Sequence, residues 1–225
     1  MKFLIFDAGP IISLTMSGIL DVLEKLKKEF RGEFILTPSV HREVVEKPMK
    51  IKKYMLEAML VKSMISRGVF TPSRKYVSDG RLEAETRKIL KLANGILRSK
   101  QSGEKIKIIH EGEASCLAFS RICGAENVLV VDERTTRVLT EAPQKLQEMI
   151  ERKVHSPLEM DKALVGKFSG FKFIRSAELL FVAFKKGLIP FGKDRQALGA
   201  LLYGVKFKGT AISSGEIEEI KSLVS

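Results

Sequence analysis

Residues 2–14 constrain the fold more than any other part of this sequence. Four large apolar residues at 3–6 run directly into Asp7, and Gly9 and Pro10 then break the run. A short, continuous apolar run bounded by turn residues is typical of a strand buried on both faces, as in a parallel sheet. We therefore expect Asp7 to follow the carboxyl end of a central strand, where open α/β sheets bind their ligands.

The same pattern recurs later in the chain and predicts an α/β fold. Residues 127–131 form a second apolar run, which ends at Asp132 and Glu133, and shorter runs lie at 33–37 and 171–174. Segments of helical spacing separate these runs, which indicates a central, mostly parallel sheet with right-handed crossovers. We expect a single domain over 1–225, with a basic helical insertion at about 49–107 and extra helices at about 143–167.

The positive charge of the chain is concentrated in that insertion. The net charge is +12, and residues 50–107 hold 15 Lys and Arg against five Asp and Glu. A polycation of this kind suits a polyanionic nucleic acid, although solvated helix faces are the alternative. The cations that we assign to nucleic-acid binding in the insertion are Lys50, Lys52, Lys53, Arg87, Lys88 and Lys91.

Two further acids open predicted helices. Glu43 lies on the same turn as two buried valines, and Glu113 follows a glycine at the start of a helix over 111–124. Taken alone, each is explained by the stabilising effect of an acidic side chain in the first helical turn. Their position next to the strands that end at Asp7 and Asp132 favours a shared site instead.

Clustered carboxylates of this kind predict a metal site. Several acids in one place repel one another unless a cation lies among them. Ligands that are all oxygen select Mg²⁺ or Mn²⁺, which also bind phosphate oxygens and assist phosphodiester cleavage. Arg134 and Arg137, which open the next helix, either contact phosphate or balance the acids.

The order of these motifs resembles that of the PIN-domain superfamily, closest to prokaryotic and archaeal members related to toxin–antitoxin nucleases. The resemblance covers about 1–48 and 108–203. It implies a three-layer PIN-like fold and an Mg²⁺- or Mn²⁺-dependent endoribonuclease acting on single-stranded or structured RNA. It also implies a homodimer and an antitoxin-like or RNA-processing partner protein. By this similarity the metal ligands are Asp7, Glu43, Glu113 and Asp132, with Glu133 as the alternative to Asp132.

Three features depart from the family pattern. The residue after the first aspartate is Ala8 where the family commonly has Thr or Ser, and the later acidic pair is Asp132 and Glu133. The basic insertion and the helices at 143–167 have no counterpart in small toxin-type members. These departures favour a specialised RNA-processing protein and keep open a catalytically weak or inactive RNA-binding or scaffold protein.

Other classes of protein fit the sequence less well. A haloacid-dehalogenase-type phosphatase needs a second acid two residues after the first, and that position is Gly9. His41 and His110 lie close to proposed ligands, but a structural or solvated role is expected for each. Cys116 and Cys123 are expected to be unpaired, and no apolar run is long enough for a membrane span, so a cytoplasmic protein with no membrane partner is expected.

Overall fold

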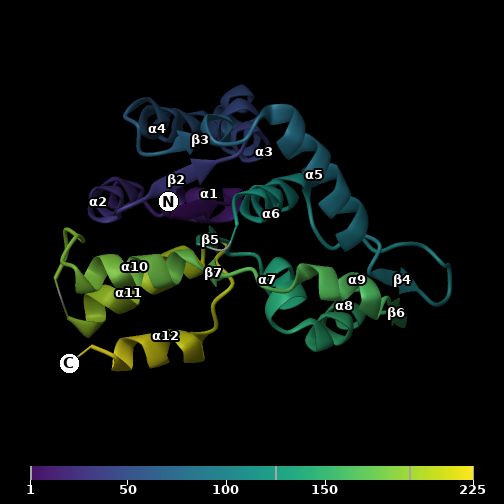
Figure 1. Ribbon diagram of the computed structural model, residues 1–225. Helices are drawn as coiled ribbons and strands as arrows, with labels where there is room; N and C mark the ends of the chain where they lie inside the picture. Colours follow the sequence, from purple (N-terminus) through teal and green to yellow (C-terminus); the bar gives the residue numbers. More distant parts are fainter. Residues whose placement is uncertain (1, 125, 193, 225) are drawn as a thin grey trace.

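A five-stranded parallel sheet forms the centre of the protein, which confirms the expected α/β class. The structure is a computed structural model that describes residues 2–124, 126–192 and 194–224. The strand order is β3-β2-β1-β5-β7, so that the first strand is central (Figure 1). The strands are β1 (Phe3–Phe6), β2 (Glu33–Leu36), β3 (Thr71–Pro72), β5 (Asn127–Val130) and β7 (Phe173–Ile174).

The central position of β1 follows from its unbroken apolar sequence. Phe3 pairs with Glu33 of β2 on one side and with Asn127 of β5 on the other. The rings of Phe6, Phe34 and Phe70 are buried together, with ring centroids 5.0 and 5.3 Å from that of Phe6. The chain leaves β1 towards β2 and later returns to β5, so the topological switch point lies between β1 and β5.

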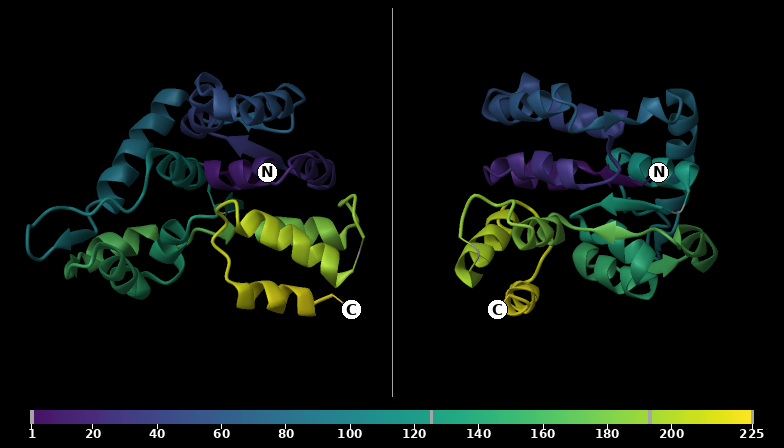
Figure 2. Two further views of the ribbon diagram at one scale, coloured as in Figure 1. Left: turned by 180° about the vertical axis from the view of Figure 1, so that it is seen from behind. Right: turned by 60° about the vertical axis from the view of Figure 1, so that its left-hand side comes forward.

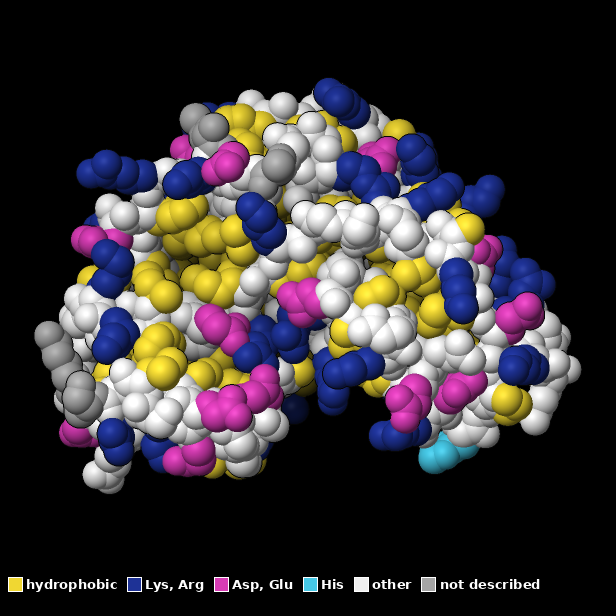
Figure 3. Space-filling model, turned by 60° about the horizontal axis from the view of Figure 1, so that its bottom comes forward, with side chains coloured by type: hydrophobic (Ala, Val, Ile, Leu, Met, Phe, Trp, Pro, Cys, Tyr) yellow, Lys and Arg dark blue, Asp and Glu magenta, His cyan; other side chains and the backbone are white. Residues whose placement is uncertain are grey.

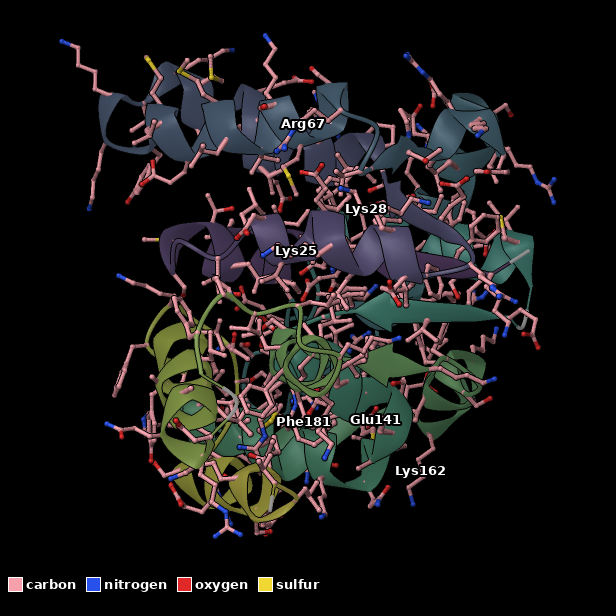
Figure 4. All side chains as sticks on the ribbon, turned by 90° about the vertical axis from the view of Figure 1, so that its left-hand side faces the viewer. Lys25, Lys28, Arg67, Glu141, Lys162 and Phe181 are labelled. Carbon is pink, nitrogen blue, oxygen red and sulfur yellow. The ribbon has the colours of Figure 1, made fainter. Side chains whose placement is uncertain are left out.

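One group of helices packs together on one face of the sheet. It contains α1 (Ala8–Met16), α2 (Asp21–Glu29), α4 (Met55–Ser66), α10 (Ser176–Lys185) and α11 (Arg195–Lys206), and α12 (Ser214–Ser222) packs on α11. The sequence pattern predicts one helix from Pro10 to the residues before Gly32. The structure divides it at Gly18, whose φ of 70° lies in the left-handed region that ends helices. Figure 4 shows α4 stacked over α2, where Arg67 pairs with Glu24 at 2.5 Å.

The opposite face carries α3 (Pro38–His41), α5 (Asp79–Ala93) and α6 (Glu111–Cys123), so the molecule has three layers (Figure 2). The chain continues α3 as a π-helical segment, Arg42–Glu46. The sequence around Pro38 predicts a helix with Ser39 as its N-cap, which is wrong: the hydroxyl of Thr37 accepts the N–H of Val40, because the helix begins two residues earlier, at Pro38.

The insertion is less helical than its sequence predicts. Two 3₁₀ turns, Pro48–Lys50 and Lys52–Tyr54, precede α4, which buries only Ala58, Val61 and Met64. The insertion also supplies β3, which pairs with β2 at the edge of the central sheet. The apolar spacing from Leu82 to Ile96 predicts a helix over about 81–97. This helix is α5, which stops at Ala93 and is followed by a further strand.

That further strand, β4 (Leu97–Ser99), joins the insertion to the second extra segment of the chain. It pairs antiparallel with β6 (Leu158–Met160), which lies between α8 (Leu146–Val154) and α9 (Lys162–Val165). We call residues 95–107 and 143–168 together the β4–β6 lobe. The lobe lies beside α7 (Arg134–Glu141), at the lower right of Figure 1. Two segments that are distant in the sequence therefore form one structural unit.

The lower half of the molecule is divided. Seen from below, a notch separates the side formed by α10, α11 and α12 from the side formed by the β4–β6 lobe, and Lys and Arg side chains lie along it (Figure 3). In the described part of the chain, no helix is long and apolar enough to cross a membrane.

Candidate functional site: an acidic cavity at the switch point

A cavity of about 540 Å³ opens where β1 and β5 end. Ligand sites in open α/β sheets occupy this position, because the helices that follow the two strands leave on opposite sides of the sheet. Acidic side chains from four different elements line the cavity, together with one histidine: Asp7, Glu43, Glu113, Glu133 and His110. Sequence segments more than 120 residues apart thus contribute to one acidic wall.

Asp7 lies at the base of this wall. It follows β1 directly, its backbone N–H donates to Val130 of β5, and its side chain is only 6% exposed. Burial raises the pKa of Asp7 to about 7, and the charges of Glu113 and Glu43 add to the increase against the amides of Ala8 and Gly9. The neighbouring acids therefore lie close enough to Asp7 to oppose its ionisation.

Glu43 is held against the wall by contacts between helices. The hydroxyl groups of Thr37 and Ser115 are 2.6 Å apart and tie the start of α3 to α6. The π-helical segment then carries Glu43 to Gly112, where an added Cβ atom would lie 3.1 Å from both carboxylate oxygens. Single-turn π segments occur frequently at functional sites. Glycine at 112 therefore leaves the space that the Glu43 carboxylate occupies.

Glu113 joins α6 to α7. One carboxylate oxygen accepts the N–H of His110 at 2.6 Å, and the other accepts the hydroxyl of Thr136 at 2.7 Å. Burial raises the pKa of Glu113 and the charge of Glu133 adds to this, whereas the two hydrogen bonds lower it. Glu113 is thus both a helix-capping residue and a buried acid of the cavity. Stabilisation of the first helical turn and a place in the acidic cluster, which are alternatives on the sequence alone, occur together at this residue.

The structure separates the adjacent acids Asp132 and Glu133. Glu133 is exposed, lines the cavity and caps α7, where it accepts the N–H and hydroxyl of Thr135. Asp132 is buried and is not among the cavity-lining residues. Its carboxylate accepts the hydroxyl groups of Ser13, Ser176 and Thr210 and the backbone N–H of Ser176, at 2.8–3.0 Å.

The remaining predicted residues lie at varied distances from the wall. His41 binds Glu46 on the surface and lines a different pocket. Arg134 is exposed, whereas Arg137 is half-buried, and its Nε atom has no hydrogen-bond partner among the described residues. Burial lowers the pKa of Arg137, and the charge of Arg175 adds to this effect. The six cations of the insertion are exposed, and none lines the acidic cavity: Lys50, Lys52, Lys53, Arg87, Lys88 and Lys91.

The sequence interpretation missed the second side of the cavity. Two lysines and four apolar residues line this side, and they lie in the β4–β6 lobe or directly after its first segment: Lys107, Lys153, Ile106, Ile108, Ile150 and Val154. No local pattern in the sequence indicates that residues 106–108 and 150–154 meet. An excess of lysine close to a predicted acidic site was the only signal in the sequence that could have suggested them.

The acidic wall suits a divalent metal ion in charge and in donor type. The carboxylates of Asp7, Glu43 and Glu113 form no salt bridge with a described cationic side chain, and hard oxygen ligands are those that Mg²⁺ and Mn²⁺ prefer. However, within residues 2–124, 126–192 and 194–224, no group of three or more His, Cys, Asp or Glu side chains is arranged to hold a metal ion. The three carboxylates would have to move together to bind one ion.

Comparisons of this chain with protein-family models, with curated proteins and with solved structures found no match. The function is therefore inferred from the cavity and from the distribution of charge.

Gly112 provides a test of the wall that leaves every carboxylate in the chain. We expect Gly112→Ala to slow a reaction at the cavity by about 10- to 100-fold, because the new methyl group displaces the Glu43 carboxylate and small displacements of reacting groups are costly. Thermal stability should change little, since alanine favours the helix. The measurement is the RNA cleavage expected from the sequence, in parallel with thermal unfolding.

Gly80→Ala is the matched control for this substitution. An added Cβ atom at Gly80 meets no other atom within 4 Å, so activity should stay unchanged. Equal activity of the two alanine variants would contradict the placement of Glu43 in a functional wall.

Proposed function

We propose that this chain is a PIN-like, metal-dependent endoribonuclease. The observation that supports the proposal most directly is the acidic cavity at the topological switch point. Asp7, Glu43 and Glu113 come from three separate elements and line it, and burial together with the other two charges raises the pKa of Asp7 to about 7. Such an arrangement is unfavourable unless a cation offsets it, and the basic excess of the chain suits a polyanionic substrate.

In this proposal each residue has a defined task. Asp7, Glu43 and Glu113 would bind Mg²⁺ or Mn²⁺, and Glu133 would complete the acidic wall from the start of α7. A bound ion of this type supplies Lewis-acid activation of a phosphodiester and of an attacking water. Asp132 positions the wall, because it fixes the end of β5 to α1 and α10. The cations of the insertion hold RNA on the surface in a manner that depends on salt. The free thiols of Cys116 and Cys123 agree with a reducing, cytoplasmic setting, which we also propose.

The proposal is tested by incubating end-labelled single-stranded RNA with the purified protein, in Mn²⁺, in Mg²⁺ and in EDTA. We expect internal cleavage with either metal and none in EDTA. Thermal unfolding followed in the same buffers should show a higher melting temperature with Mn²⁺, since a ligand that binds only the folded state stabilises it. Cleavage of equal rate in EDTA would contradict the proposal.

A second candidate is a PIN-fold RNA-binding or scaffold protein without catalysis. The observation that favours it is that, in the described residues, no three potential ligands are already arranged around a metal position. This candidate predicts RNA binding that weakens with salt and that is lost when the lysines of residues 50–107 are neutralised, with no cleavage in any metal.

The insertion also offers a surface for a protein, such as a second copy of this chain or an acidic, antitoxin-like or RNA-processing partner. On α4 the side chains of Leu56, Met59 and Leu60 are 66%, 54% and 46% exposed, next to exposed lysines. Gel filtration with and without RNA distinguishes two outcomes. A dimer mass without RNA indicates self-association, whereas an increase in mass only with RNA indicates binding of RNA alone.

A further inference from the structure

The β4–β6 lobe gives the acidic cavity a second wall of opposite character. The acidic wall comes from the end of β1, the π-helical segment and the starts of α6 and α7, whereas Lys107 lies just before α6 and Lys153 lies on α8. Neither lysine forms a salt bridge with a described acidic side chain, although four carboxylates line the same cavity. The two walls are therefore separated by enough space for a ligand, and a volume of about 540 Å³ is in the range of small-molecule sites.

The positions of both lysines are fixed by the chain around them. The side chain of Asn94 accepts the N–H groups of Ile108 and Ile109 and donates to the carbonyl of Ile109, which holds the segment that carries Lys107. On the other side, Gln147 and Glu151 of α8 bind the backbone of Leu158 in β6. This keeps Lys153, two residues further along α8, on the cavity side of the lobe.

Apolar side chains accompany the two lysines. Ile106 is half-buried and Val154 is 38% exposed, and both line the cavity beside the lysines. A wall with two ammonium groups and an apolar surface matches a nucleotide, which has an anionic phosphate and a largely flat, weakly polar base. The acidic wall repels a phosphate that has no metal partner, so an approaching phosphate is directed to the lysines.

We propose that the β4–β6 lobe binds the nucleotide next to the cleaved phosphodiester, with its phosphate on Lys107 and Lys153 and its base against Ile106 and Val154. This inference rests on the proposed ribonuclease function. It gives the two segments that are absent from small toxin-type PIN proteins a common task, because one strand pairing brings both to the cavity. It also orients the RNA, with the cleaved phosphate at the carboxylates and its neighbour at the lysines.

The test compares two double variants that each lose two positive charges from the lobe. Lys107→Ala/Lys153→Ala changes the cavity, and Lys145→Ala/Lys162→Ala changes two exposed lysines that do not line it. Lys162 lies on α9, at the lower right of the view in Figure 4. The probe is a fluorescent 2′-O-methyl RNA oligonucleotide over a range of NaCl concentrations, in EDTA, which removes the metal ion that the proposed cleavage requires.

The cavity variant should bind the probe at least about 10-fold more weakly than the wild type, and the slope of log Kd against log salt should fall by about 1.4. In the control variant, Kd should change by less than about 2-fold and the salt slope by less than about 0.3. Lys107→Arg/Lys153→Arg should restore binding, because the charge is retained. Val154→Ser should weaken binding by about 3-fold with an unchanged salt slope, since it removes an apolar contact only.

Equal losses of RNA affinity in the two double-alanine variants would overturn the proposal. Wild-type RNA affinity in the cavity variant, with an unchanged melting temperature, would overturn it as well. On cleavable RNA the cavity variant should raise KM with kcat nearly constant. The binding assay needs no catalysis, so it decides whether the lobe binds RNA even when the wild type does not cleave RNA. Failure of the wild type to cleave RNA contradicts the ribonuclease proposal alone.

Discussion

We expect Asp7→Asn to slow metal-dependent RNA cleavage by about a thousandfold or more and to raise the thermal stability of the metal-free protein. Loss of activity follows from the removal of the most buried carboxylate of the cavity wall, which lies at the end of the central strand. The gain in stability follows from the same burial. A substitution that destroys activity and stabilises the fold is typical of a site whose charges are assembled for function.

The direction of the pH dependence follows from the raised pKa of Asp7. That pKa is about 7 in the folded chain against 3.8 for an unperturbed group, so between these values the folded state binds the proton more tightly than the unfolded state. Stability that this group contributes is complete below about pH 4 and is lost as the pH rises through 7, by about 4 kcal/mol as an order of magnitude. Asp7→Asn removes this loss, so its melting temperature in EDTA should exceed that of the wild type at pH 8 and differ less at pH 5.

Asp21→Asn is the control for the same chemical change on an exposed carboxylate. The Asp21 side chain is 55% exposed and, among the described residues, pairs with Lys25 of the same helix, so activity and melting temperature should stay close to those of the wild type. Metal-dependent cleavage that survives Asp7→Asn would contradict the assignment of the site.

The second large effect concerns the pair of acids that follows β5. We expect Asp132→Ala to lower the free energy of unfolding by about 3 kcal/mol, because the buried N–H of Ser176 loses its acceptor and the buried hydroxyl groups of Ser176 and Thr210 keep only each other as partners. For a chain of this length this corresponds to a decrease in melting temperature of about 6–12 °C. Thermal unfolding in EDTA measures the effect without any contribution from bound metal.

Glu133→Gln serves as the comparison for Asp132→Ala. Glu133 is exposed, and glutamine retains the oxygen that accepts Thr135, so stability should change by less than about 0.5 kcal/mol while cleavage falls. The reverse result, with Asp132→Ala fully stable but inactive and Glu133→Gln active, would assign the ligand role to Asp132 and contradict a positioning role.

The parts of the fold that follow from the sequence are those with a strong local signal. The apolar runs at 3–6, 33–36 and 127–130 are strands of the central sheet, because side chains buried on both faces leave no polar alternation. The gathering of Asp7, Glu43 and Glu113 at one edge follows from the same logic, since carboxyl ends of parallel strands meet there. The position of these acids was therefore predictable, but the distances between their oxygens were not.

The parts that do not follow depend on contacts between distant segments. Strands β3, β4 and β6 have two or three residues each, which is too short for a detectable period. The role of Asp132 depends on Ser13, Ser176 and Thr210, which are spread over almost the whole chain. Sequence alone places Asp132 and Glu133 equally well in the site, because the direction of each side chain is decided by partners that only the fold brings near.

The pairing of β4 with β6 has a consequence for the order in which the protein forms during synthesis. Ser99, the last residue of β4, precedes Leu158, the first residue of β6, by 59 positions. A ribosome adds about 5–20 residues per second, so β4 waits for about 3–12 s before its partner has been made. By then Asp7, Glu43, Glu113 and Glu133 have all been synthesised. All four acids of the wall are thus made before Lys153, and the pairing of β4 with β6 can form only after every one of them has been synthesised.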